Sequence, residues 1–462
     1  MASGSTLAAG QPPPSKGKQI LVLAAVNMAA LAMSPYILAK KISRVYRKHA
    51  PHELDWRRFV IAPMQRGVPL ATKPGPRVVF LGPAFGEVRM IEALSRRLAE
   101  RCPDANFIWS IRHLPTIELT KKAHPNQPIM ITPLDNVLSV SLWARKVKPD
   151  VVVILEKFWI PNLLSVSKLA GAKVAIVNGR TNPKDRGSQL WKAGYYRWMA
   201  HNIDLFCMQT AGFVQQIRHL VRPGSRQVVT GNLKLDLQFA PLEQKRQDEI
   251  RAWLSTRGGL PLLAAGSTSG LEEEDFVLAA FLKAREVRPC ALLLAPRVLL
   301  RLPEVLENLE KHGMKVSRRS QPSDELADVY LLDTLGELSF GYTFALGAFV
   351  GGTVKGTSHN VMEPVMLGLP VCYGPMRGHF EDLQLLCEQF AVGFRCFTSE
   401  EMSAHWVRVL TDDAFLDEIR ARSEQFLQQE GGATDKTVDA LVELILSVKR
   451  SKRRSGGRGP WL

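Results

Sequence analysis

The sequence predicts an α/β protein of two tandem Rossmann-like domains preceded by an N-terminal membrane-anchor helix. Three observations lead to this prediction. The chain has 462 residues, which is enough for two or three domains. Short, continuous apolar runs alternate with helical segments, as is typical of parallel sheets covered on both faces. This alternation pauses once, near residues 236–245, and then starts again.

Three segments precede the first domain. Residues 1–19 are rich in Gly, Pro and Ser, and we expect them to be disordered. Residues 20–39 carry no charged side chain, and a run of this length can span a hydrocarbon core. A basic and Pro-rich connector, residues 40–76, follows. Its basic cluster predicts, by the positive-inside rule, that the rest of the chain lies on the cytoplasmic side. The cluster consists of Lys40, Lys41, Arg44, Arg47 and Lys48.

The anchor has two alternatives that the sequence leaves open. A cleaved signal peptide also contains an apolar run, although its core is usually shorter and ends in a cleavage site. An interfacial helix would lie on the membrane rather than cross it, with the same sidedness.

The first domain is predicted to cover residues 77–236, with an initial strand at 77–81 and a helix that begins near Glu87. Further strands are predicted at 107–111, 129–132, 151–155, 173–177, 205–208 and 227–230.

The second domain is predicted to cover residues 237–448, beginning with a charged helix at 242–254. The segment 400–448 has a helical pattern, and residues 449–462 are expected to form a mobile basic tail. Strands are predicted at 261–265, 291–295, 329–332, 348–350 and 370–373.

Charge and cysteine content narrow the class of protein. The net charge of +16 points to a polyanionic partner, such as nucleic acid, an anionic membrane or a phosphorylated substrate. None of the six cysteines forms a Cys-x-x-Cys pair, so we expect reduced, buried thiols rather than a zinc site. Tandem Rossmann-like domains alone do not identify a function, since periplasmic binding proteins, some epimerases and some glycosyltransferases share them.

The loop after the first strand runs from Gly82 to Glu87 and ends where the next helix starts. A carboxylate at this position can act as a general base on a hydroxyl group. Glu87 could equally well only complement the helix dipole.

A second motif joins Pro296 and Arg297 at the end of a strand, with Arg301 four residues later. Arginine suits bidentate recognition of phosphate or carboxylate, and the two guanidinium groups could share a helix face. An arginine at a strand end is, however, often only solvated.

Two Gly-containing turns follow in the second domain. From Asp333 to Leu338, the end of a strand is followed by an Asp-Thr turn, a Gly and the start of a helix. Exposed backbone amides at this helix start can hold phosphate. The stretch from Gly351 to Pro364 places Asn360 and Glu363 on one side of a helix start, where amides can hold phosphate and Glu363 a ribose diol. Ordinary capping explains Asp333, Thr334, Asn360 and Glu363 without a ligand.

The order of these motifs in the second domain is more specific than any one of them. Pro-Arg, then Asp-Thr-x-Gly-Glu-Leu, then Gly-Gly with His-Asn-x-x-Glu-Pro resembles the nucleotide-sugar site of Kdo (3-deoxy-D-manno-octulosonic acid) transferases. The resemblance extends from Val79 to Phe380. Other matching pieces are Gly86-Glu87, Glu156 with Pro161-Asn162, Val177 to Arg180, Thr230 to Asp236, and Ala265 to Thr268 followed by Glu272-Glu273.

The resemblance implies the GT-B glycosyltransferase architecture and a role for each matching residue. Glu87 falls on the general base of that family, and Glu156 and Lys234 fall on residues that assist the transition state. The CMP-binding positions are Pro296, Arg297, Leu335, Gly336, Glu337, Asn360, Val361, Met362 and Glu363. Further donor-site candidates are Ser267, Thr268, Arg301 and His359.

Four positions or stretches depart from the family pattern. Phe158 stands where the second Glu of a Glu-Thr-Glu stretch is usual, and Val298 stands where His usually follows Pro-Arg. Residues 181–185 replace a Ser-rich stretch, and Thr357-Ser358 replaces a Gly-Gly pair. The nucleotide-binding motifs match the family pattern, whereas the acceptor-binding part is altered. The resemblance therefore specifies the donor better than the acceptor.

The resemblance therefore implies an inverting transfer of Kdo from CMP-Kdo to a lipid A precursor, in lipopolysaccharide core biosynthesis at the inner membrane. The expected partners are CMP-Kdo, this acceptor and an anionic membrane surface, not nucleic acid. No Asp-x-Asp pair occurs in the chain, so we predict that no metal or cofactor is needed. Two alternatives remain: a related transferase that uses another nucleotide sugar, and a catalytically degenerate paralogue that only binds nucleotide or lipid.

Overall fold

The structure is a computed structural model that describes residues 69–454, apart from 83–84, 157–159, 182–189, 238–241 and 357, together with residues 17, 20, 21 and 24. All of the predicted N-terminal segment except residue 17, most of the predicted anchor and most of the connector therefore lie outside the described residues, as do residues 455–462. In the described part, no helix is both long and apolar enough to cross a membrane.

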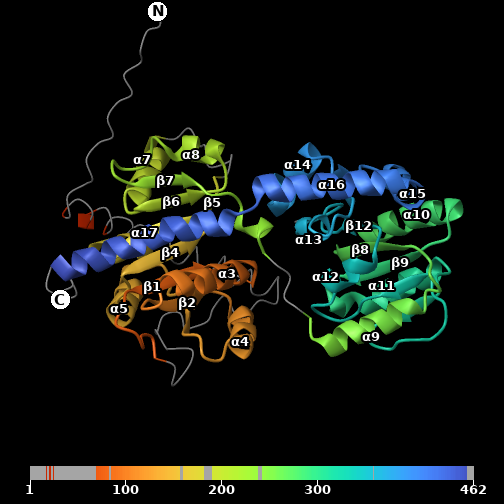
Figure 1. Ribbon diagram of the computed structural model, residues 1–462, viewed down its shortest axis with the longest axis horizontal. Helices are drawn as coiled ribbons and strands as arrows, with labels where there is room; N and C mark the ends of the chain where they lie inside the picture. Colours follow the sequence, from red (N-terminus) through yellow and green to blue (C-terminus); the bar gives the residue numbers. More distant parts are fainter. Residues whose placement is uncertain are drawn as a thin grey trace, which may run out of the picture. The chain divides into compact units, whose positions relative to one another are not determined.

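The chain forms two compact units, and the described strands of each unit form one parallel sheet (Figure 1). Unit 1 contains residues 1–237 and 431–462, and unit 2 contains residues 238–430. The first change of unit falls one residue from the predicted boundary between 236 and 237.

The described part of unit 1 contains a seven-stranded parallel sheet with the order β3-β2-β1-β4-β5-β6-β7. Continuous apolar runs form these strands because both faces of the sheet are covered. Val78 and Phe80 of β1 pack into one hydrophobic cluster, and Val79 and Leu81 pack into another. The strands are β1 (Arg77–Gly82), β2 (Asn106–Ile111), β3 (Ile129–Ile131), β4 (Val151–Leu155), β5 (Lys173–Gly179), β6 (Leu205–Met208) and β7 (Arg226–Val229).

Helices follow most strands of unit 1 and cover the two clusters. The described ones are α3 (Phe85–Arg101), α4 (Leu114–Ala123), α5 (Val137–Val147), α6 (Pro161–Leu169), α7 (Leu190–Ala200), α8 (Ala211–Ile217) and the short 3-10 helix η4 (Leu233–Leu235).

The last helix, α17 (Ala433–Arg454), belongs to unit 1 rather than to unit 2. Its side chains Val438, Leu441 and Ile445 are buried in the same cluster as Leu94 and Leu98 of α3. The prediction of one domain over 237–448 was therefore wrong for residues 431–448, because an amphipathic pattern does not show which sheet its apolar face will cover. The helix also continues to Arg454, so the first six residues of the predicted mobile tail are helical.

The described part of unit 2 contains a second seven-stranded parallel sheet, with the order β10-β11-β9-β8-β12-β13-β14. Two strands were not predicted, β10 (Val316–Arg318) and β14 (Gly393–Arg395), because each has three residues and a polar end. The predicted strands are β8 (Leu262–Thr268), β9 (Ala291–Pro296), β11 (Val329–Leu331), β12 (Gly347–Val350) and β13 (Val371–Tyr373).

The helices of unit 2 bury Trp253, Phe281 and Trp406, and all six cysteines of the chain are buried thiols, as predicted. The helices are α9 (Gln244–Ser255), α10 (Leu271–Val287), α11 (Leu302–Lys311), α12 (Leu338–Gly341), α13 (Met362–Val365), α14 (Glu381–Gln389), α15 (Ser399–Thr411) and α16 (Asp413–Glu430). Short 3-10 helices are η5 (Leu299–Arg301), η6 (Tyr342–Phe344) and η7 (Gly378–Phe380).

Each sheet has one point where the strand order reverses direction. In unit 1 this point lies between β1 and β4, and in unit 2 it lies between β8 and β12. Ligands of open parallel sheets bind at the carboxyl ends of the strands at such points. The loops after these four strands carry many of the predicted site residues, so the topology supports the predicted location of a site in each unit.

Candidate active site

In unit 1, the two predicted catalytic carboxylates follow the two strands at the reversal point. Glu87 lies in the first turn of α3, directly after β1, and its side chain is half-buried. Glu156 follows β4, which pairs with β1 along Val78 to Leu81. Gly82 lets the start of α3 approach β1, because a side chain there would lie 2.8 Å from Ile91 Cδ1 and 3.1 Å from Glu87 Cβ.

Glu156 is buried with two cations around its carboxylate. Its Oε1 lies 2.5 Å from Lys234 Nζ, and its Oε2 lies 3.6 Å from the Arg180 guanidinium. Asn178 also donates a hydrogen bond to Oε1 at 3.4 Å. The Glu156 backbone has a φ of 62°, a conformation that non-glycine residues adopt at a cost and that concentrates at functional sites. The structure thus brings the predicted residues Glu156 and Lys234 together.

The segment that carries Lys234 is fixed by hydrogen bonds to the rest of unit 1. The Leu233 amide donates to Asn178 Oδ1 at 2.9 Å, and Asn232 Oδ1 accepts from the Lys234 amide at 3.1 Å. Asp236 accepts hydrogen bonds from the amides of Gly432 and Thr434, at the start of α17. The matching piece from Thr230 to Asp236 therefore holds the Lys234 ammonium group in place.

Asn178 and Arg180 complete this cluster, although the sequence reasoning did not assign them a role. In the sequence they belong to the matching piece Val177 to Arg180, but no local pattern marks either residue as part of a site. A carboxylate with two cations leaves net positive charge, which can stabilise negative charge that develops in a transition state.

Asn162, of the matching pair Pro161-Asn162, has a structural role. Asp135 Oδ1 accepts from the Leu163 amide at 2.8 Å, and Asn162 Nδ2 donates to the Asp135 carbonyl at 2.7 Å, which ties Asp135 to the first turn of α6. Burial raises the pKa of Asp135 to about 6 in spite of these hydrogen bonds. The departures at Lys157 and Phe158 lie outside the described residues.

In unit 2, Arg297 and His359 lie on the segments after β9 and β12. Arg297 directly follows β9, is exposed, and its amide donates to the Thr268 carbonyl at 2.8 Å. His359 Nε2 lies 3.2 Å from Ser269 Oγ. Burial, aided by the positive charge of Arg297, lowers the pKa of His359 to about 4. The imidazole is therefore neutral at physiological pH and can donate one hydrogen bond and accept another.

Arg301 is bound to a carboxylate inside unit 2, and its role as a donor-site residue stays a prediction. Its guanidinium binds the buried Glu274 carboxylate through two hydrogen bonds of 3.1 and 3.0 Å. Thr268, another donor-site candidate, is fully buried and donates to the same carboxylate at 3.1 Å. Because Glu274 of α10 binds both Thr268 of β8 and Arg301 of the segment after β9, it connects these three elements.

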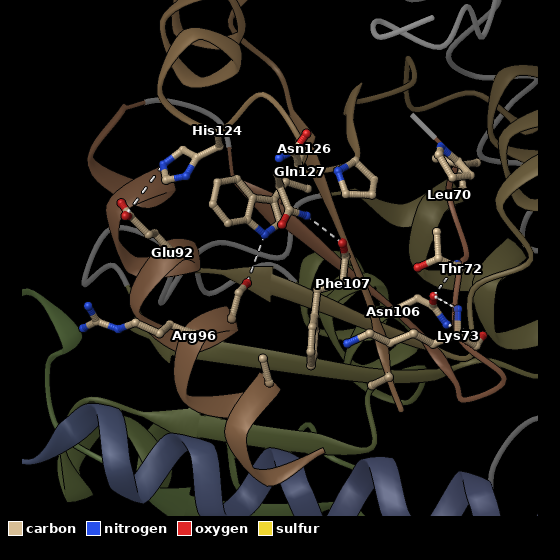
Figure 2. Close-up of a pocket in the computed structure, with 16 residues that line it drawn as sticks. Leu70, Thr72, Lys73, Glu92, Arg96, Asn106, Phe107, His124, Asn126 and Gln127 are labelled. Carbon is tan, nitrogen blue, oxygen red and sulfur yellow. Dashed lines mark hydrogen bonds and ion pairs between the residues drawn. The ribbon is translucent and has the colours of Figure 1, made fainter. Parts of the chain in front are cut away.

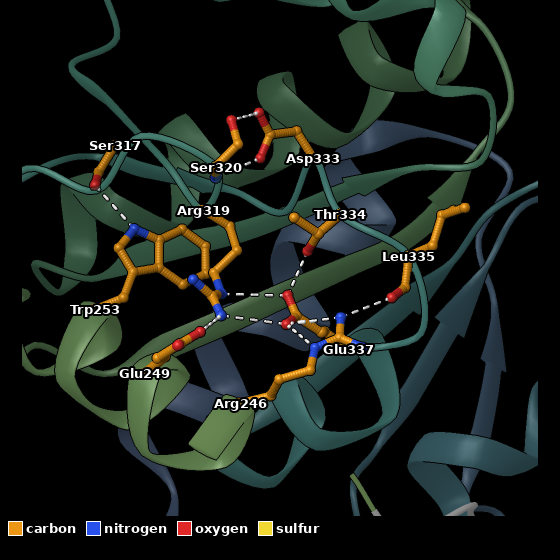
Figure 3. Close-up of polar contacts among 10 residues, drawn as sticks. All are labelled: Arg246, Glu249, Trp253, Ser317, Arg319, Ser320, Asp333, Thr334, Leu335 and Glu337. Atoms are coloured by element: carbon orange, nitrogen blue, oxygen red, sulfur yellow. Dashed lines mark hydrogen bonds and ion pairs between the residues drawn. The ribbon is translucent and has the colours of Figure 1, made fainter. Parts of the chain in front are cut away.

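Glu337 lies at the centre of a charged cluster rather than at a surface (Figure 3). It is 1% exposed, and its carboxylate binds the guanidinium groups of Arg246 and Arg319 at 2.8 and 3.2 Å and accepts from Thr334. A nucleotide cannot use this carboxylate without displacing an arginine. The Glu337 side chain therefore supports the turn, and a contact between Glu337 and CMP stays a prediction.

The exposed part of the same turn is Leu335 and Gly336. Leu335 is 72% exposed, and its side chain points away from the charged cluster, while its carbonyl accepts from Arg246 Nη2 at 2.9 Å (Figure 3). Gly336 has a φ of 81°, which a residue with a side chain would adopt at a cost.

The Asn-x-x-Glu element connects to this turn. Asn360 Oδ1 accepts from the Met362 amide at 3.1 Å at the start of α13, and Glu363 Oε2 accepts from Ser339 Oγ at 2.9 Å. Ser339 lies in α12, two residues after Glu337. The side chains of Val361 and Met362 are fully buried, so only the backbone of these two predicted residues can reach a ligand.

Unit 1 also contains a cavity of about 520 Å³ away from all of these residues (Figure 2). It lies beside α3 and the start of β2, and Lys73, Arg96, Asn106 and His124 are among the residues that line it. The amino ends of the strands form this edge, whereas the predicted catalytic residues follow the carboxyl ends. No predicted site residue lines this cavity.

Comparison with known proteins agrees with the motifs. Residues 56–237 match the sequence profile of the family described as 3-Deoxy-D-manno-octulosonic-acid transferase (kdotransferase). A 3-deoxy-D-manno-octulosonic acid transferase of Chlamydia trachomatis serovar A is 28% identical over 314 residues, which are 66% of this chain and 72% of that protein. The enzyme of the same name from Chlamydia muridarum is 26% identical over 435 residues, 91% of this chain and 96% of that protein.

A solved glycosyltransferase of Rickettsia africae has the same fold, with a TM-score of 0.56 and 12% identity over 81% of this chain and 99% of that chain. The match to the family profile in the first unit, and relatives of one name that align across both units, show that the chain is similar to 3-deoxy-D-manno-octulosonic acid transferases.

Proposed function

We propose that this protein is an inverting glycosyltransferase that transfers Kdo from CMP-Kdo to a lipid A precursor. The observation that carries the proposal is the cluster of Glu156, Lys234 and Arg180 at the carboxyl end of β4, on the strand next to the one that leads to Glu87. A protein that only binds nucleotide or lipid would not need this buried charge cluster in addition to a nucleotide site.

In the proposed reaction, Glu87 takes the proton from an acceptor hydroxyl group as its oxygen attacks the anomeric carbon of Kdo. The bond from this carbon to the phosphate of CMP breaks in the same displacement, so the configuration inverts. Lys234 and Arg297 supply positive charge that stabilises the transition state and the leaving CMP. CMP leaves as an anion that these charges stabilise, so no protein acid is required.

Donor binding is assigned to unit 2. Arg297 binds the phosphate, Glu363 binds the ribose hydroxyl groups, and the exposed turn at Leu335 and Gly336 contacts the nucleotide. The cluster around Glu337 supports this turn, because Arg246 binds both the Glu337 carboxylate and the Leu335 carbonyl. Asn360 stabilises the start of α13, on which Glu363 lies.

The lipid acceptor requires that the enzyme work at a membrane. We propose that residues 20–39 anchor the chain to the inner membrane with the two units on the cytoplasmic side. The support is the uncharged apolar run and the basic cluster that follows it in the sequence.

The test is a transfer assay with purified full-length protein, CMP-Kdo and a tetraacylated lipid A precursor in detergent, with products read by mass spectrometry. The expected product gains the mass of one or more Kdo residues, and activity persists in EDTA. A product only from a UDP- or GDP-sugar would replace the donor assignment. CMP binding without any transfer would favour a nucleotide-binding paralogue.

A further inference from the structure

The Glu273 carboxylate lies at the reversal point of the unit 2 sheet and accepts four backbone hydrogen bonds. Its Oε2 accepts from the amides of Ser269 and Gly352, both at 2.8 Å. Its Oε1 accepts from the amides of Thr353 and Val354, at 2.9 and 3.0 Å. The residue is 2% exposed, so this is an intramolecular anion site that the protein fills with its own carboxylate.

These four amides belong to the loops after the two central strands. Ser269 follows β8, and the other three residues follow β12. Gly351 has no room for a side chain, since a Cβ atom would lie 2.4 Å from the Ser267 carbonyl oxygen and 2.7 Å from Glu273 Oε2. Three consecutive amides in a glycine-rich loop would otherwise be suited to a phosphate group. With Glu273 in place, they are already hydrogen-bonded.

The two residues that bind Glu273 Oε2 also contact His359. Ser269 Oγ lies 3.2 Å from His359 Nε2. The His359 ring covers Gly352 so closely that a Cβ atom on that glycine would lie 2.9 Å from His359 Cδ2. The position of the imidazole therefore depends on two backbone segments that one buried carboxylate holds together.

We infer that Glu273 is a positioning residue of the donor site: it holds Ser269 and Gly352 so that they seat His359, and it keeps the loop amides away from the donor phosphate. The inference rests on the proposed function, in which Arg297 binds the donor phosphate, and on the prediction from the sequence that His359 is a donor-site residue. It assigns phosphate recognition to side chains rather than to this loop.

Glu273→Gln tests the inference with little change in shape. One amide oxygen can still accept from two backbone amides, but the new NH₂ group faces the other two donors. We expect the full-length variant to bind CMP roughly tenfold more weakly by calorimetry, the effect of about one lost charge-assisted interaction. The acceptor KM should not change. Glu272→Gln is the matched control, because Glu272 is the adjacent residue, is exposed, and pairs only with exposed Lys355 among described residues.

An alternative role for Glu273 predicts the opposite change in CMP affinity. If Glu273 masks a phosphate site that the donor opens, Glu273→Gln should strengthen CMP binding. Stronger or unchanged CMP binding would overturn the inference.

A double-mutant cycle separates positioning from loss of stability. Glu273→Gln and His359→Ala should be non-additive on the CMP dissociation constant, because both act through the imidazole. If Glu273→Gln does not fold, the cycle is run with Ser269→Ala and His359→Ala, which leave the carboxylate intact. Additive effects in the cycle that is run would contradict the inference. If wild-type protein binds CMP no more tightly than UMP or GMP, it is the proposed function that fails.

Discussion

The ammonium group of Lys234 lies 2.5 Å from Oε1 of Glu156, although 78 positions separate the two residues in the chain. The contact joins the end of β4 to the 3-10 helix after β7, and Asn178 binds both segments. Removal of one partner of a buried ion pair is destabilising, because it leaves charge that is less well compensated.

Lys234→Met should therefore reduce both stability and activity. We expect a loss of about 2 kcal/mol in the free energy of unfolding, because Arg180 and Asn178 still compensate part of the buried charge. The double variant Glu156→Gln with Lys234→Met should recover stability but not the rate of transfer. Thermal unfolding and single-turnover rates of the three proteins would check this. A double variant with wild-type turnover would mean that the pair is only structural.

Glu87→Gln should lower the rate of the chemical step by ~10²–10⁴-fold, the usual contribution of a general base. CMP binding should stay unchanged, because Glu87 belongs to unit 1 and CMP is assigned to unit 2. The control is Glu100→Gln, an exposed carboxylate near the end of the same helix. Near-normal turnover by the Glu87 variant would remove it from the mechanism.

Arg297→Ala and Arg301→Ala should have different effects, although both remove a guanidinium from the same segment. Arg297→Ala should weaken CMP binding by about 1.5–3 kcal/mol, as expected for a charge-assisted hydrogen bond, with unchanged thermal stability. Arg301→Ala should cost about 3 kcal/mol of stability because it leaves buried Glu274 without its cation. Calorimetry with CMP and chemical unfolding distinguish the two. Equal CMP affinity of the Arg297 variant and wild type would contradict the site assignment.

His359 should make unit 2 less stable in acid. Its folded pKa is about 4, below the ordinary value of 6.5, so the unfolded chain binds more protons between these values. Stability should therefore fall as the pH decreases from 6.5 towards 4, and be unaffected by this group above 6.5. In His359→Gln this part of the pH dependence should be absent, whereas His312→Gln, at an exposed histidine, should keep it. Thermal unfolding at pH 5 and pH 7.5 compares them, and identical shifts in all three proteins would refute the expectation.

Deletion of residues 1–39 should leave a folded enzyme that is active on detergent-dispersed acceptor but slow on acceptor in vesicles. Nearly 40 residues separate the apolar run from β1, so the run is not expected to contribute to the first core. The five basic residues at 40–48 should add ~1 kcal/mol each near an anionic leaflet. Vesicle co-sedimentation and rates, at low and high salt, are the measurements. Aggregation of the shortened protein, or equal rates on vesicles, would show that the segment is not a dispensable anchor.

The sequence by itself determined the class of fold and most of the strands. Runs such as Val151–Leu155 and Ala291–Pro296 are apolar along their whole length, and short runs of this kind between helical segments are typical of strands buried on both faces. It also predicted which loops carry the site, because parallel strands place their carboxyl ends at one edge. The order of the motifs was sufficient to indicate the family.

Only the tertiary structure decided what each charged residue does. Arg297 and Arg301 are equally polar in the sequence, yet one is exposed and the other is bound to buried Glu274. Glu272, Glu273 and Glu274 are consecutive and identical, but the first pairs with an exposed lysine, the second accepts four amides and the third binds Arg301. The partners come from distant segments, such as Thr353, and local sequence contains no information about them. The same reason explains α17, whose apolar stripe predicted a helix but could not show that it packs on the sheet of unit 1.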